Sequence, residues 1–433
     1  MRVTGAKRWL VLALGACLGG VMNFVPFLRY SYYDQMVTVF TDYANIVDAA
    51  NANEFIGNIG LAFGIFSVLM YPVGGILADK FSERNLLVIG ALIMGISSFI
   101  YGMIPSALIL ILIHVALGIG TSVFIWSAYL KVVRKMGTGE EQGKVYSVSE
   151  FVRGLLGTLV GFAGVALLNM AIMGDGTTDP IAMGHQFRNM LWLIGAVFVI
   201  LAVLIFIFIP KEIIGAEVKQ GEEEQVPFTM ANIGQVLKLP GVWLISLLIL
   251  FCFSMTSAAS GYLGAYTTAC LGISTTLASS FSIVRVYIIA CLSTLAIGFI
   301  ADKIGSTVKT LGFYAVAATI TTAGMLLTQS FVLLCITISF IFAIAYTGMR
   351  GIYFATLAEV GIPLHLTGVA TGVISLICYL PDIYFAKIAG IWLDKFGNTG
   401  YTYIWLWTIA CGILAVITAW ITYGYARKVM ASR

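Results

Sequence analysis

Two short stretches of this chain, GILADKFSER at 75–84 and GFIADKIGS at 298–306, nearly repeat each other. Each stretch follows one long apolar segment and precedes another. Asp79 lies 223 residues before Asp302 (302 − 79), about half of the 433 residues. A similar loop at the corresponding place in each half indicates that the two halves arose by duplication.

The composition indicates that the chain is surrounded by lipid. Hydrophobic residues make up 60% of it and charged residues only 10%, whereas soluble domains carry about 25% charged residues. So few charges cannot cover a surface that faces water, so we expect the surface to face a bilayer. The formal net charge of +4 is explained by the positions of the loops, and we predict no nucleic-acid partner.

The sequence offers no sign of a cofactor. The seven cysteines lie in apolar stretches and form no Cys-x-x-Cys pair, which is typical of small buried side chains rather than of metal or redox centres. There is no phosphate-binding glycine-rich motif and no cluster of metal ligands. We therefore predict no metal, no cofactor and no enzymatic activity.

Apolar runs of about 20 residues, long enough to cross a bilayer as helices, predict an all-α membrane protein with twelve spans. The first run follows Arg2, Lys7 and Arg8, but it is too long for a signal peptide, so we interpret it as a retained helix. The one long polar stretch between runs predicts a linker over 211–240, between a six-helix bundle over 1–210 and a second over 241–433. The predicted spans are 8–30, 54–78, 85–104, 107–133, 145–171, 188–210, 241–270, 275–301, 309–328, 330–357, 366–392 and 401–425.

The distribution of Lys and Arg predicts the orientation, because cytoplasmic loops carry an excess of both. With both termini inside, 17 of the 24 basic residues fall in cytoplasmic segments, two (Arg188 and Lys395) in outer loops, and five within helices. The outer loop from Ser31 to Asn53 has three aspartates and no basic residue. We therefore predict that both termini are cytoplasmic and that the number of helices is even.

The repeated loop resembles the signature loop of the major facilitator superfamily, which lies between helices 2 and 3 and has a weaker copy between helices 8 and 9. Ser82 and Glu83 depart from the pattern, because they stand where Gly and a basic residue are usual. The matching residues are Gly75, Leu77, Ala78, Asp79, Lys80 and Arg84 in the first copy and Gly298, Ala301, Asp302, Lys303 and Gly305 in the second.

This resemblance implies two pseudo-symmetric six-helix bundles and gradient-driven transport by alternating access through a cavity between them. It also implies that the loops have a conformational role. We accordingly interpret Asp79, Lys80, Arg84, Asp302 and Lys303 as gating residues rather than substrate ligands. The alternative is that they are simple charges at helix ends that set the topology.

Two further stretches, 349–354 (MRGIYF) and 379–382 (YLPD), resemble a regional pattern of nitrate-transporter-like and organic-anion-transporter-like members. The glycine-rich signatures of true nitrate transporters are missing, so the resemblance does not imply nitrate as the substrate. The chain also lacks the Gly-Pro-rich fifth-helix motif of drug/proton antiporters.

Charges inside the predicted helices are the strongest signal for a substrate site, because each costs several kcal/mol unless it faces a cavity or a partner. Cations outnumber carboxylates there, which favours an anionic substrate. The cations are Arg29, Arg153, Arg285, Arg350 and Lys387, and the carboxylates at comparable depth are Glu150 and Asp382.

Arg285 lies near the middle of the eighth predicted helix and Lys387 in the eleventh. An arginine and a lysine on these helices resemble the carboxylate-binding pair of the oxalate/formate exchanger family. Arg offers a planar fork to an oxyanion and Lys a point charge. We interpret both as substrate ligands; the alternatives are an ion pair of Arg285 with Asp382 and a Lys387 that reaches the membrane surface.

Arg29 lies within an aromatic cluster (23–33) near the outer end of the first predicted helix, where Pro26 can bend the chain toward the cavity. We predict contact with substrate; the alternative is an interfacial arginine. Glu150 and Arg153 lie three residues apart and can pair on one helical face. We interpret them and Arg350 as structural or gating residues, Arg350 with Glu359 as a partner.

Asp382 follows Pro381, which loosens the helix around it. We predict either a proton-loading carboxylate or a fixed salt-bridge partner of Arg285, Arg350 or Lys387. His114 can titrate near neutral pH or serve in packing. Among the aromatic residues, Tyr287 and Tyr379 are the predicted substrate contacts, through their hydroxyl groups.

Three function classes remain open: a proton-coupled or exchanging transporter of a small organic anion (a carboxylate, sugar acid or sulfonate), a transporter or efflux pump for neutral or cationic compounds, and a sensor that binds without transport. We favour the first and expect a multi-pass, monomeric protein of the cell membrane. Its expected partners are the small-molecule anionic substrate and the lipid bilayer.

Overall fold

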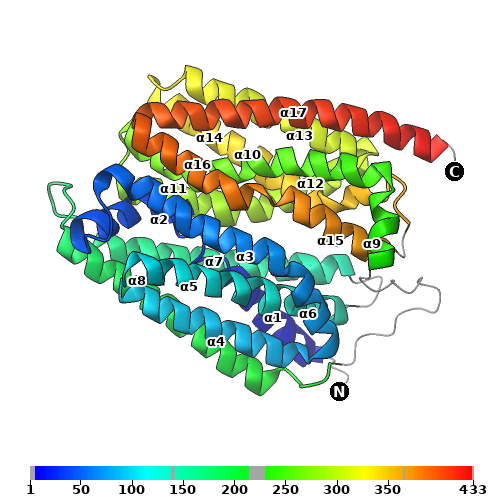
Figure 1. The fold of residues 1–433 in the computed structure, drawn as a ribbon, viewed down its shortest axis with the longest axis horizontal. Coiled ribbons are helices and arrows are strands. Elements are labelled where there is room, and N and C mark those ends of the chain that lie inside the picture. The colour runs from blue at the N-terminus through cyan, green and yellow to red at the C-terminus, as the bar shows by residue number, and fades with distance from the viewer. Residues whose placement is uncertain (1–4, 138–141, 214–229, 364–365, 432–433) are drawn as a thin grey trace.

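The computed structural model describes residues 5–137, 142–213, 230–363 and 366–431, and these form a bundle of long helices (Figure 1). Eleven helical segments within them are long and apolar enough to cross a membrane. Backbone groups in hydrocarbon have no water to bond, and helices satisfy them internally. The prediction of an all-α membrane protein is confirmed.

Eleven of the twelve predicted spans coincide with these segments. The helices are α1 (Gly5–Val21), α2 (Arg29–Thr38), α3 (Ala52–Lys80), α4 (Glu83–Gly102), α5 (Ala107–Ile119), α6 (Ser127–Lys135), α7 (Gln142–Asn169), α8 (Pro180–Phe208), α9 (Met230–Leu237), α10 (Pro240–Leu271), α11 (Thr275–Ile283), α12 (Ala290–Ile304), α13 (Thr307–Leu327), α14 (Val332–Met349), α15 (Thr367–Cys378), α16 (Pro381–Phe396) and α17 (Asn398–Ala431).

The remaining predicted span, 8–30, is interrupted. Helix α1 ends at Val21, the chain turns through residues 22–28, and α2 continues into the π-helix η1 (Val39–Tyr43). Much of the outer loop that we expected from Ser31 onward is therefore helical. A search for apolar runs misses α2 because its buried face is polar and aromatic and packs against α10 and α11.

Three further crossings are interrupted near their middles. The π-helix η3 (Gly120–Trp126) joins α5 to α6, and the π-helix η5 (Val284–Ile289) joins α11 to α12. A short turn before Pro381 separates α15 from α16. Such breaks release backbone groups from the helical hydrogen-bond pattern and are frequent at functional sites.

The two halves of the sequence lie on opposite sides of the bundle. In Figure 1, α4 to α8 form the lower part and α10 to α17 the upper part, and both termini lie at the right. We call the end of the bundle at which the termini lie the terminal end, and the other end of the bundle the opposite end. Which end faces the cytoplasm stays a prediction, and so does the division at 211–240; most of that linker, 214–229, lies outside the described residues.

Each repeated stretch contains a serine that caps the start of the next helix. The Ser82 side chain accepts a hydrogen bond from the backbone NH of Asn85 at the start of α4, and that of Ser306 accepts one from Lys309 at the start of α13. These serines satisfy backbone donors that a helix leaves free in its first turn. The duplication seen in the sequence thus extends to the local structure.

The halves pack most closely along α3 and α16, where glycines face the partner backbone. A side chain at Gly64 would collide with the backbone carbonyl of Asp382, and one at Gly57 would lie 2.6 Å from the backbone oxygen of Ala386. Small residues let membrane helices approach this closely. This contact brings the α16 residues around Asp382 against the first half.

Candidate substrate site

Three of the predicted site residues lie at the helix interruptions. Arg29 is the first residue of α2, Arg285 lies within η5, and Asp382 is the second residue of α16. Discontinuous membrane helices form the substrate and ion sites of many secondary transporters, because their free backbone groups line the cavity. The interruptions therefore mark the central part of the molecule as the candidate site.

Arg285 is buried, with 2% of its surface exposed. Its guanidinium donates hydrogen bonds to the hydroxyls of Ser339 (3.2 Å) and Ser282 (3.3 Å) and lies 5.5 Å from the ring centre of Phe340. No ion pair within 4.0 Å joins it to a carboxylate in the described part of the chain. The alternative pairing with Asp382 is thus not formed, and two serine hydroxyls and the ring of Phe340 surround this cation.

Arg29 is also buried, with 5% of its surface exposed. Its guanidinium carbon lies 5.3 Å from the ring centre of Phe27 and 5.1 Å from that of Tyr30. The Nε atom is buried and makes no hydrogen bond. Aromatic faces stabilise a cation weakly, so Arg29 retains donors for an anion.

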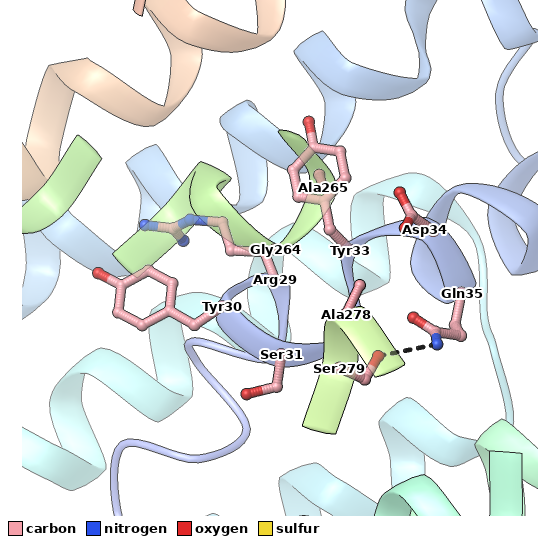
Figure 2. Close-up of a pocket in the computed structure, with 10 residues that line it drawn as sticks. All are labelled: Arg29, Tyr30, Ser31, Tyr33, Asp34, Gln35, Gly264, Ala265, Ala278 and Ser279. Atoms are coloured by element: carbon pink, nitrogen blue, oxygen red, sulfur yellow. Dashed lines mark hydrogen bonds between the residues drawn. The ribbon is translucent and has the colours of Figure 1, made fainter. Parts of the chain in front are cut away.

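A small hollow of ≈ 10 Å³ lies beside Arg29, between α2, α10 and α11, and is about large enough for one water molecule. Figure 2 shows Arg29 and Tyr30 extending to one side of it and Asp34 and Gln35 to the other. The Gln35 amide donates a hydrogen bond to the Ser279 hydroxyl (3.1 Å) and so connects the two halves. The volume is below the roughly 300–1,000 Å³ of pockets for drug-sized ligands.

Asp382 makes no ion pair within 4.0 Å among the described residues; it accepts a hydrogen bond from the Ser257 hydroxyl at 3.4 Å. The positive charges that act on it are Arg29 and Arg350. Asp382, Arg29 and Arg350 also act electrostatically on the hydroxyl of Tyr30. These residues therefore form one polar cluster around Tyr30, in which positive charge exceeds negative charge.

Two other helical cations have carboxylate partners. Arg153 pairs with Glu150 (2.5 Å), and Lys387 lies 3.9 Å from Glu54 of the other half. Arg350 is exposed, and the structure shows no contact between it and Glu359. Glu359 instead accepts hydrogen bonds from three groups at the start of α13: the Ser306 hydroxyl and the backbone NH groups of Thr307 and Val308.

The predicted gating residues lie at helix ends rather than in loops: Asp79 and Lys80 end α3, Arg84 lies in the first turn of α4, and Asp302 and Lys303 lie near the end of α12. Lys80, Asp302 and Lys303 are exposed, and the side chain of Asp79 lies outside the described part. The Arg84 guanidinium carbon lies 5.0 Å from the ring centre of Phe206.

The buried charge in the first loop is Glu83, one of the residues that departs from the family pattern. It pairs with Lys135 (2.5 Å) and Lys131 (3.8 Å).

The structure places the other three predicted site residues among packed side chains. His114 is buried, with Nδ1 2.8 Å from the backbone oxygen of Leu110. The ring of Tyr287 stacks on Phe24, with centres 5.8 Å apart. The ring of Tyr379 lies edge-on to Phe253 at 4.8 Å. Of the three, His114 has the most enclosed surroundings.

The sequence analysis missed one polar contact between the halves at the opposite end. The carboxylate of Asp394, near the end of α16, accepts hydrogen bonds from the backbone NH groups of Asn53 (3.2 Å) and Glu54 (2.7 Å). It also accepts one from the Asn53 side chain (2.7 Å). A carboxylate of one half thus caps the first turn of α3 in the other.

The fold and the charged interruptions together define a membrane transporter with two facing halves. Residues 10–386 match the model of the Major Facilitator Superfamily, and the chain belongs to this family. It is a secondary transporter that works by alternating access, as predicted, and not an enzyme.

The chain is similar to two curated proteins of Escherichia coli (strain K12). Inner membrane protein YqcE is 27% identical over 425 residues, which are 96% of this chain and 95% of that protein. Inner membrane protein YihN is 22% identical over 397 residues, which are 90% and 88%. A solved structure of the xylose transporter XylE from E. coli has a TM-score of 0.71 at 14% identity and covers 96% of this chain and 98% of that one. An identity of 14% with XylE supports a shared fold and nothing about the substrate.

Proposed function

We propose that this transporter moves a small organic anion, such as a carboxylate, sugar acid or sulfonate. The observation that carries the proposal is the environment of Arg285. A buried arginine without a carboxylate is costly in a membrane protein, and Arg285 has serine hydroxyls as its hydrogen-bond partners. An anionic substrate supplies the missing negative charge.

Arg29 has the second role in the proposed site. Its buried Nε lacks a partner, and an arginine fork matches the two oxygens of a carboxylate or sulfonate. Lys387 is a weaker candidate, because Glu54 is 3.9 Å away. Tyr287 and Tyr379 are proposed to border the substrate.

Coupling is proposed to run through Asp382, either by proton symport or during anion exchange. Its carboxylate has one hydrogen bond, from Ser257, and no fixed ion pair within 4.0 Å in the described residues, so its charge can change during the cycle. His114 is the other candidate, but its ring nitrogen is already bonded to a backbone carbonyl. Glu150, Arg153, Arg350 and the two repeated loops are proposed to act in gating.

The alternative function is transport or efflux of neutral or cationic compounds. A related fold belongs to a D-xylose-proton symporter, but at 16% identity that likeness does not extend to the substrate. In this alternative, the buried arginines have only a structural role. Arg285 therefore separates the two functions experimentally.

The chain is a multi-pass protein of the cell membrane, consistent with its apolar helices and with two relatives named as inner membrane proteins. The monomeric state and the cytoplasmic position of both termini stay predictions.

Ligand-induced stabilisation of the purified protein tests the proposal. Carboxylates, sugar acids, sulfonates, neutral sugars and hydrophobic cations are screened by their effect on the melting temperature. A ligand at a hundredfold excess over its Kd stabilises the folded state by about 2.7 kcal/mol. We expect an anion class to stabilise the wild type and the Arg427→Gln control, in which an exposed arginine is replaced, but not Arg285→Gln. Equal stabilisation of Arg285→Gln by anions, or a response only to neutral or cationic compounds, would refute the proposal.

A further inference from the structure

Two buried arginines come from different halves of the chain and lack a carboxylate. Arg29 belongs to α2 in the first half and Arg285 to η5 in the second. Neither has a carboxylate oxygen within 4.0 Å in the part of the chain that the structure describes. Figure 2 shows Arg29 and Asp34 pointing away from each other, so the nearby aspartate does not neutralise it.

The other helical cations are neutralised or solvated. Arg153 pairs with Glu150 and Lys387 lies beside Glu54. Arg350 is exposed to solvent. The single carboxylate of the central cluster, Asp382, is opposed by Arg350 as well as by Arg29. Arg29, Arg285 and Arg350 therefore outnumber Asp382 by two positive charges (3 − 1).

One turn of α10 lies between the two buried arginines. A side chain at Gly261 would lie 3.8 Å from Nε of Arg29. A side chain at Gly264 would lie 2.6 Å from the Ser282 hydroxyl, which accepts a hydrogen bond from Arg285. Positions three residues apart on a helix have Cβ atoms about 5–6 Å from each other. The missing side chains at these two positions let Arg29 and Tyr30 pack against Gly261 and let Ser282 pack against Gly264 on one face of α10.

We infer that the substrate carries two anionic groups, one bound by Arg29 and the other by Arg285, across the turn of α10 that holds Gly261 and Gly264. The inference rests on the proposed anion transport and narrows its substrate to small dianions, such as dicarboxylates. A monoanion satisfies one guanidinium and leaves the other buried without a partner. A dianion satisfies both and connects the two halves at the same time.

Matched ligands test this inference on the purified full-length protein. Succinate, monomethyl succinate and dimethyl succinate have nearly the same carbon chain and carry two, one and no negative charges when the free carboxyl groups are ionised. Malonate and adipate, each with its monomethyl ester, test shorter and longer separations. We expect at least one of these dianions to bind the wild type about tenfold or more tightly than its own monoester, because charge-assisted hydrogen bonds are lost with the ester.

The arginine variants assign the two ends of the ligand. In Arg29→Gln and in Arg285→Gln, the preference for that dianion over its monoester should disappear, since one arginine remains in each. Arg29→Lys and Arg285→Lys retain the charge and should retain most of the preference. Arg427→Gln, at an exposed position, should behave as the wild type. Melting temperatures without ligand show whether each variant is folded.

The results separate the dianion inference from the proposed transport of an anion. If monoesters bind the wild type as tightly as the dianions at every length, the substrate is a monoanion; the dianion inference is then wrong and anion transport stands. The same conclusion follows if only other single-charge anions bind. If no anion binds, or if dimethyl succinate binds best, both the inference and the proposed function fail.

Discussion

The contact of Asp394 with α3 gives a measurable prediction about the conformational equilibrium. Its carboxylate accepts hydrogen bonds from the backbone NH groups of Asn53 and Glu54 and from the Asn53 side chain. Asp394 lies in the second half of the molecule, and these partners lie in the first. This contact exists only while the halves are together at the opposite end. Asp394→Ala removes the contact and should therefore favour the state in which that end is open.

The size of the effect follows from the geometry. Loss of a helix N-cap costs about 1 kcal/mol, and loss of a negative charge at a helix N-terminus costs about 0.3–1 kcal/mol at a partly exposed site. Together these give about 1.3–2 kcal/mol, or a roughly 10- to 30-fold shift in the equilibrium. Asp394→Asn retains a capping oxygen and loses the charge, so we expect roughly a 2- to 5-fold shift.

Hydrogen exchange of the backbone amides at the start of α3 reads this equilibrium directly. The amides of Asn53 and Glu54 should exchange faster in Asp394→Ala by the same factor of roughly 10 to 30. Asp48→Asn is the matched control, because Asp48 is exposed beside α3 and its side chain makes no capping hydrogen bond. Exchange in Asp394→Ala at the wild-type rate, or an equal increase in the control, would refute the reasoning.

Three more substitutions have defined outcomes. Gly64→Ala introduces a methyl group against the backbone of α16 and should reduce transport about tenfold, since overpacking costs about 1–3 kcal/mol; Gly424→Ala in α17, with open space around it, should transport normally. Glu359→Gln weakens the cap of α13 and should lower the free energy of unfolding by about 1 kcal/mol, measured by thermal melting. Glu83→Gln removes the pairs with two partly exposed lysines and should cost about 0.5–1 kcal/mol, less in high salt. Asp302→Asn, at an exposed position near the end of α12, is the control for both glutamates and should melt with the wild type.

Most of the fold could be predicted because membrane-spanning helices leave a local signal. A run of about 20 apolar residues is sufficient to identify a helix, and eleven of the predicted spans coincide with observed segments. The first crossing differs because α2 owes its burial to contacts with α10 and α11. Arg29, Tyr33 and Gln35 are buried there, and each contacts a residue of the second half that lies more than 200 residues away.

The charged residues of the site could be recognised for a related reason, since any charge within an apolar run is conspicuous. The local partner of Arg153, Glu150, could be recognised, but partners far away in the sequence could not. Lys387 lies beside Glu54, and Asp394 caps the same helix start, across 333 (387 − 54) and 340 residues of sequence. Glu54 and Asp394 stand at the ends of apolar runs, where acidic residues are common and carry no special signal.

The placement of these charges suggests how the substrate and the gates work together. At the opposite end, Asp394 and Glu54 provide contacts between the halves that are complete without a ligand. At the terminal end, Glu83 and Glu359 bind partners within their own halves. At the centre, Arg29 and Arg285 are buried and have no carboxylate within 4.0 Å among the described residues, and we propose that the substrate supplies the negative charge. These two arginines come from different halves, so a dianion that neutralises both also holds the halves together. We therefore expect a dianion to stabilise the closed arrangement of the site more than a monoanion does.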